Sequence, residues 1–452
     1  MWYDDLHRIQ RQREMLLGQR LWYVLAAGLG VASIISRQPV IFVIGLLIGS
    51  ISAISDVWYR RGQRDLTVEQ RLSTQRAFMG DVIALETEIE NRKSLPLPNL
   101  EIESDLPNAL RWDGKSSPMF LDPQRHLLRT SLSLGRWQRA TRENLLYCSE
   151  RGAYWIGSPT IRTGDPIGWL SRTERYVRPA MPLLIYPLIA PLETFNLPAM
   201  YPFGPLVSSR RLLEDPLRVS GVRDYVPGDD PRQIHWKATA RTGALRTKVL
   251  DPSGQHRIIL ILDINSYNGS YFGFIPTLLE LNICVAASIA HWALDEGFAT
   301  GLLGTSPIIA EEAIMGKAPP SLEPLWLAPS SHRSQRERIL SSLARLQPYL
   351  GAPIEALIDY HRRSFVAGTT AILISSVHAL RAPTVEYLAE LQPHGVGAHI
   401  VLIGSAHELN RLPTFDIPMH YIGGKEVWDA LVTAARQNAA GKSADAVSFS
   451  LG

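Results

Sequence analysis

Residues 257–264 read RIILILDI, an apolar run that ends close to an aspartate. A continuous run of this length is typical of a strand buried on both faces of a parallel sheet. Helical periodicity follows from Pro276 to about Glu296. Strands are then predicted at FATGLLG, TAILISS and AHIVLIG, and helices at RERILSSLARL and VEYLAEL. This alternation predicts a doubly wound α/β domain over residues 255–436, with a mostly parallel sheet and a flexible tail at 437–452.

The polar residues after this first strand are the first candidate site, because ligands of open α/β sheets gather at the carboxyl ends of the strands. Asp263, Asn265 and Tyr267 lie there, and a later strand ends in Ser375 and Ser376. Mg²⁺ prefers several oxygen ligands in an octahedral arrangement, and a single carboxylate makes a weak cage. We therefore expect a vestigial metal site at Asp263 and Asn265, with Mg²⁺ binding as the alternative and no other cofactor.

The second candidate site precedes the run and reads RDYVPGDDPRQIHWKATAR, residues 223–241. Its arginines can pair with carboxylates through two parallel hydrogen bonds, and its prolines and glycine predict a turn. One interpretation is an ion-pair knot that clamps the loop between two domains; the other is a surface that docks a partner. The acidic residues argue against a nucleic-acid site. The signature residues are Arg223, Tyr225, Gly228, Asp229, Asp230, Arg232, Trp236 and Arg241.

Upstream, the apolar pattern changes to period two. In DVIALETEIEN and NLEIESDLP, apolar residues alternate with charged ones, and further strands are predicted at HLLRTSLSL, ENLLYCSE, GSPTIRTG and PLLIYP. Short alternating strands with Pro and Gly between them predict a small β-sandwich over residues 66–188. A linker that contains the signature follows at 189–254. Asp165, in RTGDPIGWL, is interpreted as a turn-capping residue.

The N-terminal region contains two uncharged apolar runs, LWYVLAAGLGVASIIS (21–36) and VIFVIGLLIGSISAIS (40–55). Extended by their neighbours, they approach the length that spans a bilayer, so residues 21–59 are predicted to form a transmembrane helical hairpin. Arginines flank the hairpin on both sides, while the turn holds only Arg37. By the positive-inside rule, residues 1–20 and the C-terminus lie in the cytoplasm and the protein in the inner (plasma) membrane. A buried soluble hairpin is the alternative.

Composition limits the function further. With 46% hydrophobic and 20% charged residues the chain is an ordered protein, and a net charge of +3 gives no basic field for nucleic acid. Cys148 and Cys284 have no metal-ligand spacing, so a disulfide framework is not expected. The sequence contains no Gly-x-x-x-x-Gly-Lys-Ser/Thr, Gly-x-Ser-x-Gly or His-Glu-x-x-His motif. We therefore predict no catalytic residues.

The run GVRDYVPGDDPRQIHWKATAR (221–241) closely resembles the signature of the bacterial domain of unknown function 58 family, and Ile234 and Ala240 also match. The two apolar runs and RGAYWIGSPTIRTGDPIGWL resemble its upstream layout. The resemblance implies a von Willebrand A-like α/β domain and partnership with a MoxR-type AAA+ ATPase or with other von Willebrand A-type proteins. The Asp-x-Ser-x-Ser metal loop of such domains differs here, because Asn265 and Tyr267 replace its serines.

These observations predict a non-enzymatic, membrane-anchored adaptor or scaffold that acts with the ATPase in chaperone-like maturation of protein complexes. A metal-dependent von Willebrand A-type protein-binding module is the alternative. A hydrolase of envelope metabolism ranks last, because no catalytic motif supports it.

Overall fold

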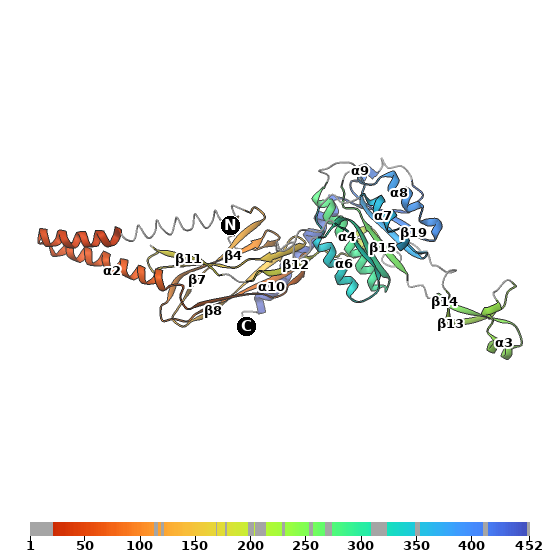
Figure 1. The fold of residues 1–452 in the computed structure, drawn as a ribbon, viewed down its shortest axis with the longest axis horizontal. Coiled ribbons are helices and arrows are strands. Elements are labelled where there is room, and N and C mark those ends of the chain that lie inside the picture. The colour runs from red at the N-terminus through yellow and green to blue at the C-terminus, as the bar shows by residue number, and fades with distance from the viewer. Residues whose placement is uncertain are drawn as a thin grey trace.

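The fold is described from a computed structural model of the chain. An elongated molecule carries two helices at one end and a small hairpin at the other, with a β domain and an α/β domain between them (Figure 1). The described residues are 21–112, 116–118, 122–168, 170–176, 179–197, 203, 214–227, 231–252, 256–266, 274–308, 323–348, 353–409 and 415–449.

Two apolar helices near the N-terminus confirm the coarse prediction for this region. The first runs from Leu21 to Ser36, and α2 (Pro39–Arg61) follows after a tight turn. They pack closely at Gly45, where an added Cβ would lie 3.1 Å from the carbonyl oxygen of Ala26. α2 is long and apolar enough to cross a membrane, and only 17% of its apolar window is buried. α4 (Pro276–Asp295) is also long and apolar, but 72% of its apolar window is buried, so it is a core helix.

The β domain is built mainly from two antiparallel sheets that share a hydrophobic core. The core includes Val68 and Ile89 from one sheet and Leu100, Ile102 and Ile161 from the other. The first sheet has the order β1 (Leu66–Leu72), β3 (Val82–Asn91), β8 (Arg139–Cys148), β5 (Leu110–Arg111). The second has the order β11 (Ser171–Arg175), β10 (Thr160–Gly164), β4 (Leu97–Pro107), β7 (Arg125–Leu134), β6 (Ser116–Pro118).

A third, three-stranded sheet connects this domain to the next. Its order is β2 (Arg76–Phe78), β12 (Met181–Tyr186), β9 (Gly152–Ile156). β12 and β9 pack against α6 (Ser334–Arg345). Short η helices follow at Leu192–Phe195, Pro231–Gln233, Arg362–Ser364 and Gln392–His394.

The α/β domain has a six-stranded sheet in which β17 alone runs antiparallel to its neighbour. Alternate residues of β15 enter two different cores: Leu260 packs with α4 and α6, and Ile259 packs with α7 and α8. Helices therefore cover both faces, as the sequence predicts. The sheet order is β17 (Pro324–Ser330), β16 (Ala299–Pro307), β15 (Arg257–Leu262), β18 (Thr369–Ser376), β19 (Gly397–Ile403), β20 (Met419–Gly423). The helices are α4 (Pro276–Asp295), α6 (Ser334–Arg345), α7 (Ile354–Tyr360), α8 (Ala382–Ala389) and α9 (Ala406–Leu409).

The C-terminal region differs from the prediction. α10 runs from Lys425 to Phe449, so residues 437–449 continue a helix where the sequence predicts a flexible tail. The helix contacts α4, β20 and β3, and thereby bridges the two domains. Leu431 and Ala439 are buried on it, and Ala439 lies at the start of the segment whose small polar residues alone predict fraying.

Candidate functional site

The signature segment forms a separate β-hairpin. β13 (Glu214–Asp224) pairs with β14 (Arg246–Pro252), and α3 (Trp236–Thr242) lies between them. Figure 1 shows this hairpin extending from the α/β domain, at the end of the molecule opposite the two N-terminal helices. The larger packing contacts of β13, β14 and α3 are with one another. The signature therefore builds a projecting arm, which we call the signature hairpin (residues 214–252).

Local hydrogen bonds explain why this sequence folds as a hairpin. The imidazole Nδ1 of His235 accepts a hydrogen bond from the backbone N–H of Ala238 at 3.0 Å and so caps α3. Gly243, with φ 69°, ends the helix in the left-handed region, where glycine is the natural residue. Arg246 forms an ion pair with Asp224 at 2.7 Å. Ile234 is buried and bridges to Thr247, which fastens the loop to β14.

The outer surface of the signature hairpin combines apolar and cationic side chains. Trp236 is 68% exposed and Val226 54% exposed. Arg223 and Arg241 are exposed, and Tyr225 is half-buried. A tryptophan that remains this exposed on a helix flanked by arginine has the composition of an interface centre, where Trp, Tyr and Arg are enriched.

Part of the signature lies outside the described residues: Gly228, Asp229 and Asp230 entirely, and Arg232 in its side chain. The carboxylates that an ion-pair knot would need are among them. The described part of the segment packs on itself and lies away from the β domain (Figure 1). The ion-pair interpretation stays a prediction, because Asp229 and Asp230 lie outside the described residues.

Among the described residues, a buried ion pair at the domain junction is instead formed by Arg151 and Glu280. The guanidinium of Arg151 lies 2.9 Å from the carboxylate of Glu280 on α4. Its Nη1 donates to the carbonyl oxygens of Leu343, Ala344 and Leu346 at 2.9, 3.2 and 2.9 Å. These carbonyls end α6, where a cation is favoured by the helix dipole. Sequence reasoning missed this pair, although a single acid within the apolar run of α4 was a usable signal.

Asp263 follows β15 at the carboxyl edge of the parallel sheet, as the sequence predicts. Its Oδ1 accepts hydrogen bonds from the backbone N–H and the side-chain Nδ2 of Asn265 at 3.1 and 2.8 Å, and its Oδ2 accepts one from Ser375 at 3.3 Å. Burial raises the pKa of Asp263 to about 6, and the hydrogen bonds from Asn265 and Ser375 oppose this. Tyr267 lies outside the described residues.

The fit of this edge to a divalent cation is poor in the described part of the chain. No group of three or more His, Cys, Asp or Glu that could hold a metal occurs among the described residues. Around Asp263 the neutral oxygens that could ligate a metal are those of Asn265 and Ser375. Both oxygens of the Asp263 carboxylate already accept hydrogen bonds. A hard cation would need further anionic oxygens.

Asp165 has the turn-capping role that the sequence predicts. The carboxylate accepts a hydrogen bond from the backbone N–H of Leu170 at 3.1 Å and is 1% exposed. Its second oxygen accepts a hydrogen bond from Ser55 of α2. Asp165 therefore also fixes the end of α2 to the β domain, a contact that sequence spacing could not reveal.

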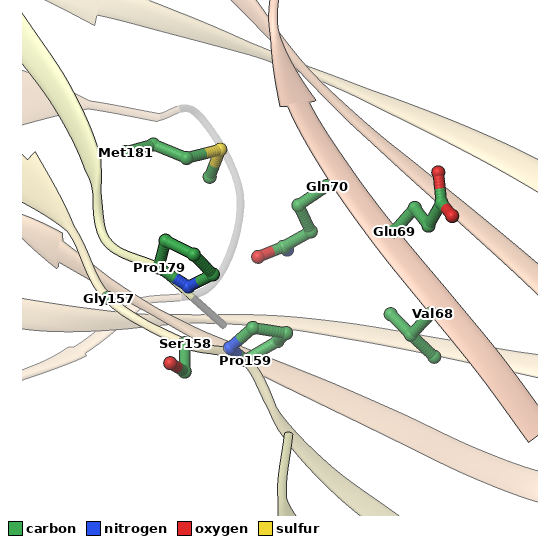
Figure 2. A pocket seen from close by; sticks show the side chains of 8 residues that line it. All are labelled: Val68, Glu69, Gln70, Gly157, Ser158, Pro159, Pro179 and Met181. Carbon is green, nitrogen blue, oxygen red and sulfur yellow. The ribbon is translucent and has the colours of Figure 1, made fainter. Parts of the chain in front are cut away.

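The described cavities do not bring catalytic groups together. One hollow of about 220 Å³ lies between β1 and the turn 157–159, and Figure 2 shows Gln70, Pro159 and Met181 around it. Gln70 is held by hydrogen bonds to Ser104 and Thr87, at 2.7 and 3.2 Å. A larger groove of about 690 Å³ between β2, the linker and α10 is mainly apolar. No nucleophile with a paired base lines either one.

Comparisons with known proteins match part of the chain. A family model described as "Protein of unknown function DUF58" matches residues 221–318. The uncharacterized protein YeaD of Bacillus subtilis (strain 168) is 24% identical over 244 residues, which cover 53% of this chain and 56% of YeaD. The match thus spans little more than half the length of that relative.

Solved structures resemble only a portion of the chain. The CARDB domain of the PF1109 protein from Pyrococcus furiosus is 13% identical, covering 27% of this chain and 92% of that domain at a TM-score of 0.18. A cohesin module from a Clostridium perfringens family 33 glycoside hydrolase is 11% identical, covering 27% of this chain and 95% of that module at a TM-score of 0.19. The sequence comparisons show that the signature hairpin and the first elements of the α/β domain match the DUF58 family, and that YeaD is a distant relative.

Proposed function

We propose that this protein is a membrane-anchored adaptor without catalysis of its own, which presents the signature hairpin to a cytosolic partner. The observation that carries the proposal is the exposure of Trp236 on an arm that projects from the end of the molecule opposite α2 (Figure 1). An exposed tryptophan is a typical binding hot spot.

The anchor in this proposal is the hairpin formed by the helix at residues 21–36 and α2. The exposed apolar side chains of α2, such as Leu46 at 61%, suit a lipid environment. By the positive-inside rule, the arginines at both flanks support a topology with both termini in the cytoplasm. The β domain is then a cytosolic β-sandwich, and the α/β domain a von Willebrand A-like module that carries the arm.

The partner we propose is a MoxR-type AAA+ ATPase, because resemblance to the DUF58 family implies such an association. Other von Willebrand A-type proteins are further candidates. The arm can be matched to the ATPase by charge: Arg223, Lys237 and Arg241 are exposed around Trp236 and would face an acidic surface. The ATPase would supply the nucleotide hydrolysis, and this chain the placement at the membrane.

The experiment is affinity capture of the full-length protein from its native membranes in the presence of ATP, with mass-spectrometric identification of partners. The Trp236→Ala protein should no longer capture the ATPase. It should remain folded, because the Trp236 side chain is exposed. Tyr360→Ala, which removes an 82% exposed aromatic residue from α7, is the matched control and should retain it. Recovery of the same ATPase with both variants would contradict the docking role of the arm.

Metal-dependent protein binding is a second candidate, favoured by the position of Asp263 beside Ser375 at the carboxyl edge of the sheet. It predicts that Mg²⁺ or Mn²⁺ gives a binding heat in calorimetry that Asp263→Asn abolishes. Equal traces for both proteins would remove this candidate.

A further inference from the structure

We propose that the end of the β domain beside α2 is a lipid-contact surface that rests on a bilayer with anionic headgroups. This inference rests on the membrane anchoring proposed above and extends it to a part of the protein outside the helices. We call this surface the membrane-proximal end; it comprises residues 60–65, 92–96, 135–138 and 165–168.

Contacts show that these segments meet at one end of the domain. The Nζ of Lys93 donates to the carbonyl oxygen of Arg64 at 2.6 Å, and the backbone N–H of Trp137 donates to the carbonyl oxygen of Lys93 at 3.2 Å. The indole N–H of Trp58 donates to the carbonyl oxygen of Pro96 at 2.9 Å. Three loops of the β domain therefore surround the C-terminal end of α2.

The length of α2 determines how close this end lies to the bilayer. Ser55 is buried and donates a hydrogen bond to Asp165, so the loop that contains Ile167 lies beside the helix well before it ends. The stretch from Pro39 to Ser55 rises only about 25 Å, at roughly 1.5 Å per residue. The hydrocarbon core is about 30 Å thick. If α2 spans it, the 165–168 loop must lie at the level of the headgroups.

The exposed apolar side chains of these loops fit that level. Trp137 is 69% exposed at the tip of the β7–β8 turn, and Ile167 is 45% exposed. Trp137 has φ 54°, a left-handed conformation that is uncommon for a bulky residue. In water the exposed apolar area of both side chains would make no stabilising contact. Tryptophan is enriched at the membrane interface, where its ring is in contact with headgroups and acyl chains.

Charge identifies the class of headgroup. Arg61, Arg64 and Arg136 are exposed and form no ion pair with any residue that the structure describes. The neighbouring acids Asp56 and Glu90 are paired with Arg60 and Arg92, and Asp65 is an exposed acid within this end that offsets only one of the three arginines. The surface thus carries excess positive charge beside its apolar side chains. Near an anionic bilayer each such arginine increases association about fivefold, equivalent to ~1 kcal/mol.

The test uses full-length protein in nanodiscs of equal parts phosphatidylcholine and phosphatidylglycerol, with nitroxide-labelled lipid as quencher. A fluorophore is attached at Ile167→Cys, with Leu46→Cys as the bilayer reference and Tyr360→Cys as the distant reference. Cys148 and Cys284 are buried, and burial raises the pKa of both thiols to about 12, so neither competes for the label.

We expect lipid quenching at Leu46 and at Ile167 and none at Tyr360. Quenching at Leu46 alone would overturn the lipid-contact surface and leave the anchor intact. Absence of quenching at Leu46 would overturn both.

Adding Arg136→Gln to the Ile167→Cys protein tests the headgroup class. We expect the ratio of lipid-contacting to lipid-free label at position 167 to fall about fivefold, because one arginine contributes that factor to association with an anionic bilayer. An unchanged ratio, together with equal quenching in pure phosphatidylcholine, would overturn the preference for anionic lipid. Arg363→Gln, which removes an exposed arginine near the distant reference Tyr360, is the matched control and should leave the ratio unchanged.

Discussion

Replacing Arg151 by methionine should loosen the junction between the two domains more than any surface substitution there. The Arg151 side chain is 6% exposed, is paired with Glu280, and donates to three carbonyl oxygens that end α6. Methionine retains much of the aliphatic packing but leaves the carboxylate and the carbonyls without their donor. Removing one partner of a buried pair destabilises by ~3–5 kcal/mol. For domains of this size that corresponds to roughly 6–20 °C in Tm.

The matched control crosses the same junction on the surface. Arg76 pairs with Glu337 of α6, but their side chains are 58% and 52% exposed. An exposed pair contributes only about 0–1 kcal/mol, so Arg76→Met should lower Tm by less than about 4 °C. Tm is followed by intrinsic tryptophan fluorescence of the full-length protein in nanodiscs, with Glu280→Gln completing a double-mutant cycle. Equal Tm shifts for the two arginine variants, or no coupling energy between Arg151 and Glu280, would show that this pair does not stabilise the junction.

Three further predictions concern single sites. Burial raises the pKa of Asp263 to about 6, so the folded state favours the protonated form; this contribution is present below the unfolded pKa and is lost as pH rises through about 6. Asp263→Asn should therefore stabilise the protein at pH 7 by up to ~3 kcal/mol and have little effect near pH 4, measured by urea unfolding at both pH values; destabilisation at pH 7 would point to a bound cation. Phe203 is 2% exposed and packs edge-on against His399, with 5.4 Å between the ring centroids. Phe203→Ala should therefore lower the free energy of unfolding by ~3–5 kcal/mol in the same assay, and a loss below about 1 kcal/mol would contradict its packing role. Ser55→Ala leaves the buried Asp165 carboxylate short of one donor and should increase hydrogen exchange at the α2–β1 link, whereas unchanged exchange would argue against that contact.

Much of the architecture follows from local pattern. The period-two alternation of DVIALETEIEN predicts β3, and the apolar run RIILILDI predicts β15, because the local sequence of each strand determines which of its faces are buried. β17 and α7 have weaker patterns and were not predicted. β17 is a half-buried edge strand with two prolines, and α7 is only 7 residues long.

The candidate site was predicted in part. The residues of the signature were identified, but their place on a projecting hairpin depends on the pairing of β13 with β14 across the intervening α3, which periodicity does not encode. The ion pair at the junction lies between residues 129 positions apart, Arg151 and Glu280, and such a contact arises only from tertiary packing. Helical continuation past residue 436 is explained in the same way, by the contacts of α10 with both domains.

The central claim is that the signature hairpin is a docking arm for a cytosolic partner of a membrane-anchored protein. The most direct measurement is site-specific photo-crosslinking in living cells, with a photoreactive amino acid in place of Trp236 and, as a control, in place of Tyr360. We expect a crosslink from position 236 to a AAA+ ATPase in the membrane fraction and none from position 360. A crosslink from position 236 only to other parts of this same chain would contradict the account.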